Sequence, residues 1–173
     1  MKRALYQGLF LSLVLLTAGC GFHLRGYGVE TAFSDFFVVA SPSSILQADL
    51  RQVLRTAGAA ESASRSDADV VIEILDERSQ QRAASTTGTA RVAEYELEVG
   101  ALIGIQDGNG AVLAAPQWVN RIRVYRIDRD NLTGNSQEQT LVERELRADV
   151  VQAVLRTVNA VTRNRVVNTG NAG

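Results

Sequence analysis

The fold is decided by the stretch AEYELEVGALIGIQDGNG, which covers residues 93–110. Apolar residues alternate with glutamates in its first half, and a repeat of two residues is typical of a strand that buries one face. Its last four residues, Asp107-Gly108-Asn109-Gly110, are a strong hairpin signal. The pattern predicts a strand over residues 90–106 that turns into an antiparallel neighbour over 111–127. Proline cannot donate to a strand ladder, so we expect a break or bulge near Pro116.

Further strands and helices flank this hairpin on both sides. They are predicted, in chain order, as a strand over 35–40, a turn over 41–44, a helix over 45–57, a loop over 59–67, a strand over 70–85 and a turn over 86–89, followed after the hairpin by a loop over 128–135 and a helix from Ser136 to about Asn164. Each helix carries an apolar stripe at helical spacing. The serines of the 41–44 turn supply an N-cap, Gly58 ends the first helix, and Ser136 and Gln139 have the spacing of a capping box.

The element order β-α-β-β-β-α predicts an α+β fold. Two amphipathic helices can cover only one face of a four-stranded sheet, so we expect a two-layer sandwich with both helices packed on one face of a mixed sheet. This domain is expected over residues 35–165, and residues 166–173 are expected to form a flexible C-terminal tail.

The N-terminus has the pattern of a bacterial lipoprotein signal peptide. Lys2 and Arg3 precede a short apolar run, and small residues then lead into Cys20, the only cysteine. We therefore expect cleavage after residue 19, lipidation of Cys20 and a lipidated tether over residues 20–34. Several acyl chains anchor a protein stably, whereas one holds it only marginally. Gly21, where inner-membrane lipoproteins commonly have Asp, points to the outer membrane. The alternative is an N-terminal membrane anchor with an incidental cysteine.

Composition argues against several functions. The chain has 18 basic and 19 acidic residues, and removing Lys2 and Arg3 with the signal leaves 16 against 19, a net charge of −3. This balance gives no reason to expect nucleic-acid binding. Lipidation consumes the only thiol, and the lone His23 can form neither a metal site nor a catalytic triad. We expect no enzyme and no cofactor beyond the covalent lipid; a hydrolase is the weakest alternative, because the chain offers no nucleophile–base pair.

Two motifs carry a family resemblance: Cys20-Gly21-Phe22-His23-Leu24-Arg25-Gly26 at the start of the mature chain, and Ala93-Glu94-Tyr95 within the alternating strand. With the element order, they resemble the LptE family of lipopolysaccharide (LPS)-assembly lipoproteins. The resemblance implies an outer-membrane lipoprotein that assists LPS export as plug and assembly partner of the LptD β-barrel and binds LPS directly. The alternative is a periplasmic lipoprotein scaffold that binds another envelope protein or peptidoglycan.

Hairpin register predicts a cluster of arginines. If residues 107–110 form a four-residue loop, Tyr95 faces Ile122 and Arg91 faces Arg126 on the inner, apolar side of the sheet. A four-residue turn over 86–89 brings Arg82 to that side, with Arg78 in the same row. Arginines beside apolar surface suit a phosphate-bearing amphipathic ligand such as LPS. Alternatively, the arginines are merely solvated, or a bulge at Pro116 shifts the pairing. The resemblance also implies LPS contact by the loop before the last helix, which adds Arg129 to this cluster. The LPS-binding candidates are therefore Arg78, Arg82, Arg91, Arg126 and Arg129.

Overall fold

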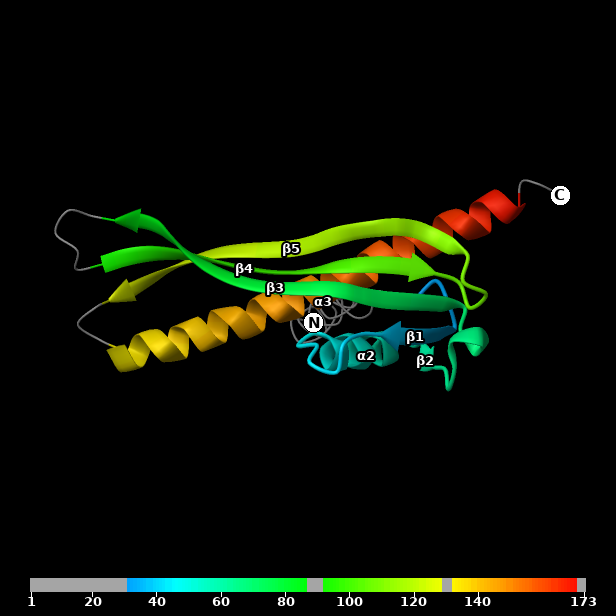
Figure 1. The fold of residues 1–173 in the computed structure, drawn as a ribbon, viewed down its shortest axis with the longest axis horizontal. Helices are drawn as coiled ribbons and strands as arrows, with labels where there is room; N and C mark the ends of the chain where they lie inside the picture. Colours follow the sequence, from blue (N-terminus) through cyan, green and yellow to red (C-terminus); the bar gives the residue numbers. More distant parts are fainter. Residues whose placement is uncertain (1–30, 87–91, 129–131, 171–173) are drawn as a thin grey trace, which may run out of the picture.

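The computed structural model describes residues 31–86, 92–128 and 132–170. In chain order these form β1 (Asp35–Val39), α2 (Gln47–Thr56), β2 (Ala60–Glu61), the 3-10 helix η1 (Arg65–Asp67), β3 (Val70–Thr86), β4 (Val92–Gln106), β5 (Val112–Asp128) and α3 (Leu132–Gly170). Three long strands lie side by side and α3 runs along them, so the molecule is elongated (Figure 1). Among the described residues, no helix combines the length and apolar character that crossing a membrane requires.

The strands form one mixed sheet with the order β2-β1-β3-β4-β5. β1 pairs in parallel with both β2 and β3, whereas β3, β4 and β5 form an antiparallel meander. The α+β class is confirmed, but the predicted number of four strands is wrong. The fifth strand, Ala60–Glu61, lies in the predicted 59–67 loop; it is two residues long and both side chains are exposed, so it has no alternating pattern to predict it.

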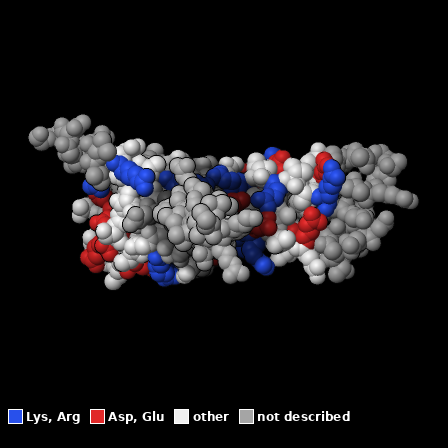
Figure 2. All heavy atoms as spheres, turned by 180° about the vertical axis from the view of Figure 1, so that it is seen from behind, with Lys and Arg blue, Asp and Glu red and all other residues white. Residues whose placement is uncertain are grey.

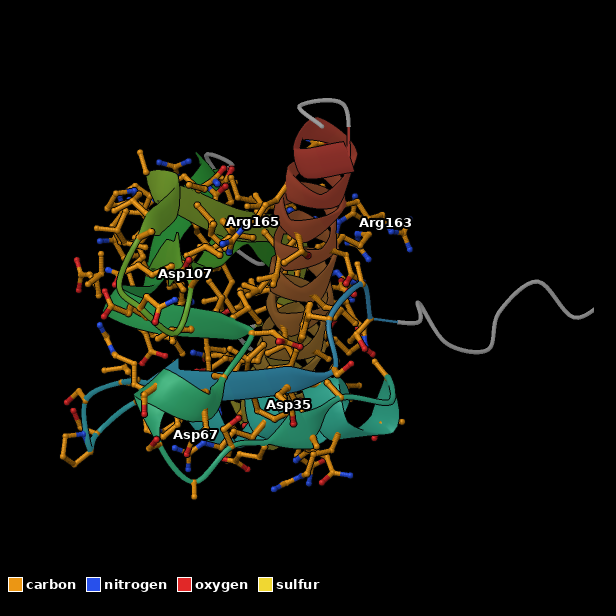
Figure 3. The ribbon with its side chains drawn as sticks, turned by 90° about the vertical axis from the view of Figure 1, so that its right-hand side faces the viewer. Asp35, Asp67, Asp107, Arg163 and Arg165 are labelled. Atoms are coloured by element: carbon orange, nitrogen blue, oxygen red, sulfur yellow. The ribbon has the colours of Figure 1, made fainter. Side chains whose placement is uncertain are left out.

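Both helices lie on one side of the sheet, as predicted (Figure 3). α3 packs against β4 and β5, while α2 packs against α3 and the short strands β1 and β2. One apolar core joins the two layers, and its fully buried side chains include Phe36, Leu54, Ile72, Ile103, Leu146 and Val158. The predicted stripes of both helices supply much of this core.

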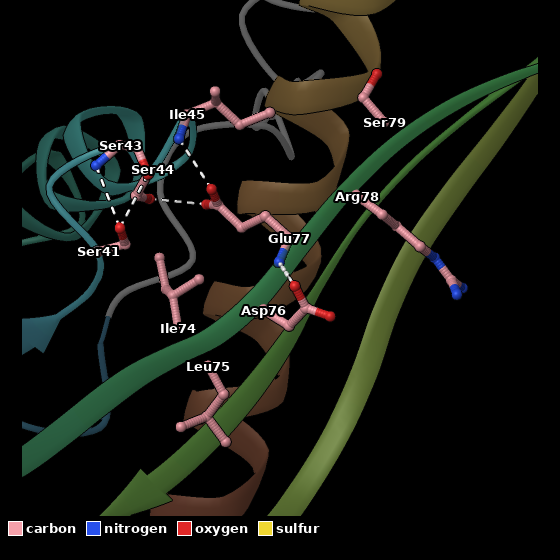
Figure 4. Close-up of a pocket in the computed structure, with 10 residues that line it drawn as sticks. All are labelled: Ser41, Ser43, Ser44, Ile45, Ile74, Leu75, Asp76, Glu77, Arg78 and Ser79. Carbon is pink, nitrogen blue, oxygen red and sulfur yellow. Dashed lines mark hydrogen bonds between the residues drawn. The ribbon is translucent and has the colours of Figure 1, made fainter.

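Both helices begin differently from the prediction. α2 begins at Gln47 and its N-cap residue is Leu46, so the predicted serine N-cap is wrong, although the Ser44 hydroxyl accepts a hydrogen bond from Gln47 N at 3.1 Å. Glu77 of β3 accepts hydrogen bonds from Ile45 N and Leu46 N at this helix start, a contact that the sequence did not reveal (Figure 4). The capping box at Ser136 is wrong, because α3 already begins at Leu132 and Ser136 lies within its first turns. α3 also continues to Gly170, past the predicted end near Asn164.

The register of β4 against β5 differs from the prediction by three residues. Gln106 pairs with Val112 and not with Ala111, and two further shifts follow on either side of Ile105, so that Tyr95 lies opposite Tyr125. The second shift falls at Ala115 and Pro116, where a bulge was predicted. Because three is an odd number, every β5 side chain beyond the bulge lies on the opposite face from the one predicted.

Candidate functional site

The three described arginines among the candidates share one surface. We call it the open face: the side of β3, β4 and β5 that points away from α3. Arg82 lies opposite Glu96, and Arg126 lies opposite Glu94. The predicted cluster of arginines on the inner face without acidic neighbours is therefore wrong. Its cause is the register: both hairpin connections are longer than four residues, and each displacement is three residues. Cys20, Arg91 and Arg129 lie outside the described residues.

Each of these arginines forms an ion pair with a glutamate of β4, and we call the three pairs the Arg–Glu ladder: Arg78–Glu98, Arg82–Glu96 and Arg126–Glu94. The outer two arginines keep most of their surface, with side-chain exposures of 67% for Arg82 and 75% for Arg126. Exposed ion pairs contribute only about 0–1 kcal/mol to stability. The ladder therefore orients guanidinium groups on the surface more than it stabilises the fold.

Arg78 occupies the most enclosed position of the ladder. Its Nη2 lies 2.7 Å from Glu98 Oε1, and its guanidinium carbon lies 4.2 Å from the centroid of the Trp118 ring. Asn120 Nδ2 also donates to Glu98, at 2.8 Å. The Asn120 hydrogen bond and the positive charge of Arg78 hold the pKa of Glu98 below its usual value. Glu98 therefore stays ionised and fixes both partners.

A glycine makes this packing possible. Gly100 of β4 pairs with Arg78 of β3 on one side and with Asn120 of β5 on the other. A Cβ atom at Gly100 would meet Asn120 Cβ at 2.9 Å. Any larger residue would separate β5 from β4 at the point where Asn120 reaches Glu98.

Exposed apolar side chains of β5 border the ladder. Trp118, Ile122 and Val124 are 40%, 50% and 52% exposed and lie opposite Leu102, Glu98 and Glu96 on the open face. An exposed apolar row next to fixed charges marks an interaction surface more often than isolated apolar residues do. The sequence did not predict this row, because the predicted pairing of Ile122 with Tyr95 placed Ile122 on the inner side of the sheet.

The same register turns two arginines of β5 towards the helix side of the sheet. Arg121 lies opposite the buried Val99, and Arg123 lies opposite Leu97. Arg123 reaches Glu145 and, at 3.5 Å, Asp149 of α3. These contacts tie β5 to the long helix. Figure 2 shows the molecule from the helix side, and where described residues are visible there, basic and acidic side chains lie near one another.

A polar network joins the far end of the sheet to α3. Gln81 Nε2 donates to the Tyr125 hydroxyl at 2.6 Å, and Gln139 Nε2 donates to Gln81 Oε1 at 3.3 Å. Burial raises the pKa of Tyr125, with smaller contributions from Tyr95 and Glu138. The network holds a phenol neutral and shows no arrangement for proton transfer.

Two cavities lie near the ends of the loops around the sheet. One, of about 400 Å³, lies between the β1–α2 loop and residues 74–79 of β3, and Asp76 and Arg78 of the open face contribute to its lining (Figure 4). The other, of about 450 Å³, lies at the β4–β5 hairpin, where Arg165 pairs with Asp107 at 2.9 Å (Figure 3). Within the described ranges, no group of three or more His, Cys, Asp or Glu side chains is placed to hold a metal ion.

Comparison with known families identifies the chain. The family model described as "LptE: Lipopolysaccharide-assembly" matches residues 33–158, which is more than half of the sequence. The chain belongs to the LptE family. Its members are non-enzymatic lipoproteins of LPS assembly, and this confirms the resemblance drawn from the N-terminal motif and the element order.

Solved structures agree with the family. An uncharacterised lipoprotein B from Nitrosomonas europaea is 27% identical, with a TM-score of 0.70 over 83% of this chain and 93% of its own. Two others share the fold: rare lipoprotein B from Shewanella oneidensis (21% identity, TM-score 0.64, 76% and 98% covered) and a minor lipoprotein from Acinetobacter baumannii (18%, 0.63, 78% and 95%). No curated protein sequence matches the chain.

Proposed function

We propose that this LptE-family chain is an outer-membrane lipoprotein, anchored through lipidated Cys20, that acts as plug and assembly partner of an LptD-type β-barrel and binds LPS. Its domain faces the periplasm or lies inside the barrel lumen. The family supports the role in LPS assembly. The observation that carries LPS binding is the composition of the open face, where the Arg–Glu ladder runs beside the exposed Trp118, Ile122 and Val124.

The ladder leaves donors for a phosphate group. A guanidinium has five N–H donors, and an ion pair with one carboxylate occupies only some of them. Arg82 and Arg126 are largely exposed, so a phosphate could approach each from solvent while the glutamate holds the arginine in place. The apolar row of β5 would then meet acyl or core-sugar surface of the same ligand. Arg78, Arg82, Arg91, Arg126 and Arg129 are the proposed LPS-binding residues.

LPS binding by a double variant tests this assignment. Arg82→Ala with Arg126→Ala should weaken binding of purified LPS to the lipidated protein in detergent, and the fold should persist because both ion pairs are exposed. Arg144→Ala with Arg156→Ala is the matched control, since both residues are exposed on α3 and the same charge is removed. Unchanged LPS binding by the folded first variant would contradict the role of the ladder.

Recovery of the tagged lipidated protein from detergent-solubilised outer membranes tests the partner. We expect a single large barrel at one-to-one stoichiometry. Recovery of the lipoprotein alone, or with peptidoglycan-associated proteins, would favour the alternative function as a periplasmic lipoprotein scaffold.

A further inference from the structure

The open face changes in character along its strands. Its part nearer the β3–β4 connection carries the largely exposed guanidinium groups of Arg82 and Arg126, and among the described residues there only β5 contributes large apolar side chains. Its part nearer the β4–β5 hairpin carries apolar side chains from all three strands. We call these the apolar section: Leu75, Leu102 and Trp118. A ligand that lies along the strands therefore meets exposed positive charge in one part and apolar surface in the other.

A bulge and a glycine build the apolar section. The bulge between Ile74 and Asp76 places Leu75 at the point where β3 changes register against β4. Gly104 of β4 has its side-chain position on the open face, and a Cβ atom there would meet Leu75 Cδ1 at 3.6 Å, so Leu75 covers the glycine. Leu75 is 50% exposed and Trp118, directly opposite Leu102, is 40% exposed. Apolar surface that is contiguous across three strands indicates a binding surface.

Paired charges close the apolar section on both sides. On one side, Arg78 pairs with Glu98 at 2.7 Å, and its guanidinium carbon lies 4.2 Å from the centroid of the Trp118 ring. On the other side, Glu73, which lies opposite Gly104, pairs with Arg65. Because these charged groups already bind one another, the section between them offers little to the hydroxyl groups of a sugar. An acyl chain needs no hydrogen-bonding partner, so it fits this surface better.

Asp76 gives the open face a direction. It lies opposite Leu102 within the apolar section, its side chain is exposed, and within the described ranges no basic side chain pairs with it. Six residues of β3 separate Asp76 from Arg82, which corresponds to about 20 Å along the strand. A phosphate is repelled at Asp76 and attracted at Arg82 and Arg126. The position of this charge therefore agrees with the position of the apolar side chains.

We propose that the open face binds LPS in one direction, with phosphate groups at Arg82 and Arg126 and acyl chains on the apolar section at Leu75, Leu102 and Trp118. The inference rests on the proposed LPS binding and adds to it an acyl-binding surface and an orientation. The reversed ligand would place phosphate beside the Asp76 carboxylate and acyl chains over exposed guanidinium groups. Both contacts are unfavourable, so the face selects one orientation.

Deacylated LPS, which keeps the phosphates and sugars, tests the acyl contact. Affinities are measured for the full-length lipidated protein in phospholipid nanodiscs, where no free detergent covers the apolar section. We expect Leu75→Ser to lower the affinity for LPS about tenfold, which corresponds to about 60 Å² of apolar surface removed from water, and to leave the affinity for deacylated LPS unchanged. Leu141→Ser is the matched control, because Leu141 is 51% exposed but lies on α3. Arg82→Ala with Arg126→Ala should weaken binding of both ligands.

Trp118 reports the same contact without a substitution, because it is the only tryptophan of the chain. LPS should shift its fluorescence emission to shorter wavelength, and deacylated LPS should not. Trp118→Phe with Val124→Trp moves the reporter to a position opposite Glu96, between the two exposed arginines. The emission of this variant should shift much less with LPS than that of the wild type.

Four results would overturn the proposal: an unchanged affinity of folded Leu75→Ser for LPS, an equal loss of LPS and deacylated LPS by that variant, an emission shift at position 124 as large as that at 118, or a Trp118 emission that shifts on binding the barrel and then no longer responds to LPS. The last result would assign the apolar section to the barrel. Unchanged binding of both ligands by Arg82→Ala with Arg126→Ala would instead contradict the proposed LPS binding by the ladder, so the two failures are distinguishable.

Discussion

Replacing Glu77 should separate the first helix from the sheet. The Glu77 carboxylate accepts three hydrogen bonds from the residues that lead into α2: from Ser44 Oγ at 2.8 Å, from Ile45 N at 2.9 Å and from Leu46 N, the N-cap residue, at 3.2 Å. The donors at a helix start have no partner within the helix, and a negative charge there also complements the helix dipole. Glu77 belongs to β3, so one side chain both caps the helix and attaches it to the central strand.

The expected loss is large for a single partly exposed residue. A hydrogen bond to a charged group is worth about 1.5–3 kcal/mol, and loss of a helix cap costs about 0.5–2 kcal/mol. Water replaces part of this at the exposed Ile45 N–H, and the three bonds are not additive. We expect Glu77→Ala to lower the free energy of unfolding by about 3 kcal/mol. Glu77→Gln keeps the shape but turns one acceptor into a donor, so we expect about 1–2 kcal/mol.

Urea unfolding followed by circular dichroism measures both losses. Glu138→Ala, an exposed glutamate of α3, is the control and should stay within about 0.5 kcal/mol of wild type. The reasoning is refuted if Glu77→Ala is as stable as this control, because the three contacts would then contribute nothing beyond what water offers.

Three other changes probe separate parts of the structure. Hydrogen bonds from Ala111 N and Arg165 hold the pKa of Asp107 below its usual 3.8. The stability that Asp107 contributes is therefore present above that pH and is lost as the pH falls towards the lowered pKa. Asp107→Asn should make the free energy of unfolding depend less on pH between about pH 5 and pH 2. Gly108→Ala places a Cβ atom 2.4 Å from Ala68 O and should cost about 1–3 kcal/mol, whereas Gly104→Ala meets only ordinary contacts from 3.6 Å and should be tolerated in thermal unfolding. Leu146→Ala empties a buried site of α3 and should cost about 2–5 kcal/mol in urea, while the half-exposed Leu141→Ala should cost less than about 0.5 kcal/mol.

Local patterns predicted the parts of the fold that depend on neighbouring residues. The alternation in β4 and the Asp107–Gly110 turn predicted a hairpin, and Gly110 indeed adopts a positive φ of 87° there. The helical stripe of α3 predicted its buried face, including Leu146 and Val158. β2 escaped prediction because a two-residue edge strand is held by backbone pairing with β1 and not by any pattern of its own. The Glu77 cap escaped because it joins residues more than thirty positions apart.

The candidate site was predicted in composition but not in arrangement. Arg78, Arg82 and Arg126 do share one face of the sheet, but with glutamates as partners and on the side away from the core. The missing information was the number of extra residues in each connection. A bulge near Pro116 could be predicted from the lack of an N–H, but the shift at Leu113 and the longer turn have no such signal.

Whether β5 is displaced against β4 by an odd or an even number of residues decides which of its side chains lie on the open face. With an even displacement, Trp118 and Ile122 would lie in the core and Arg121 and Arg123 would face solvent, which describes an ordinary solvated sheet. The odd displacement instead exposes an apolar row beside the Arg–Glu ladder and sends two arginines towards α3. One of them, Arg123, pairs with α3 and so fixes the helix against the edge strand. The same shift therefore makes the open face amphipathic and ties the β5 edge to α3.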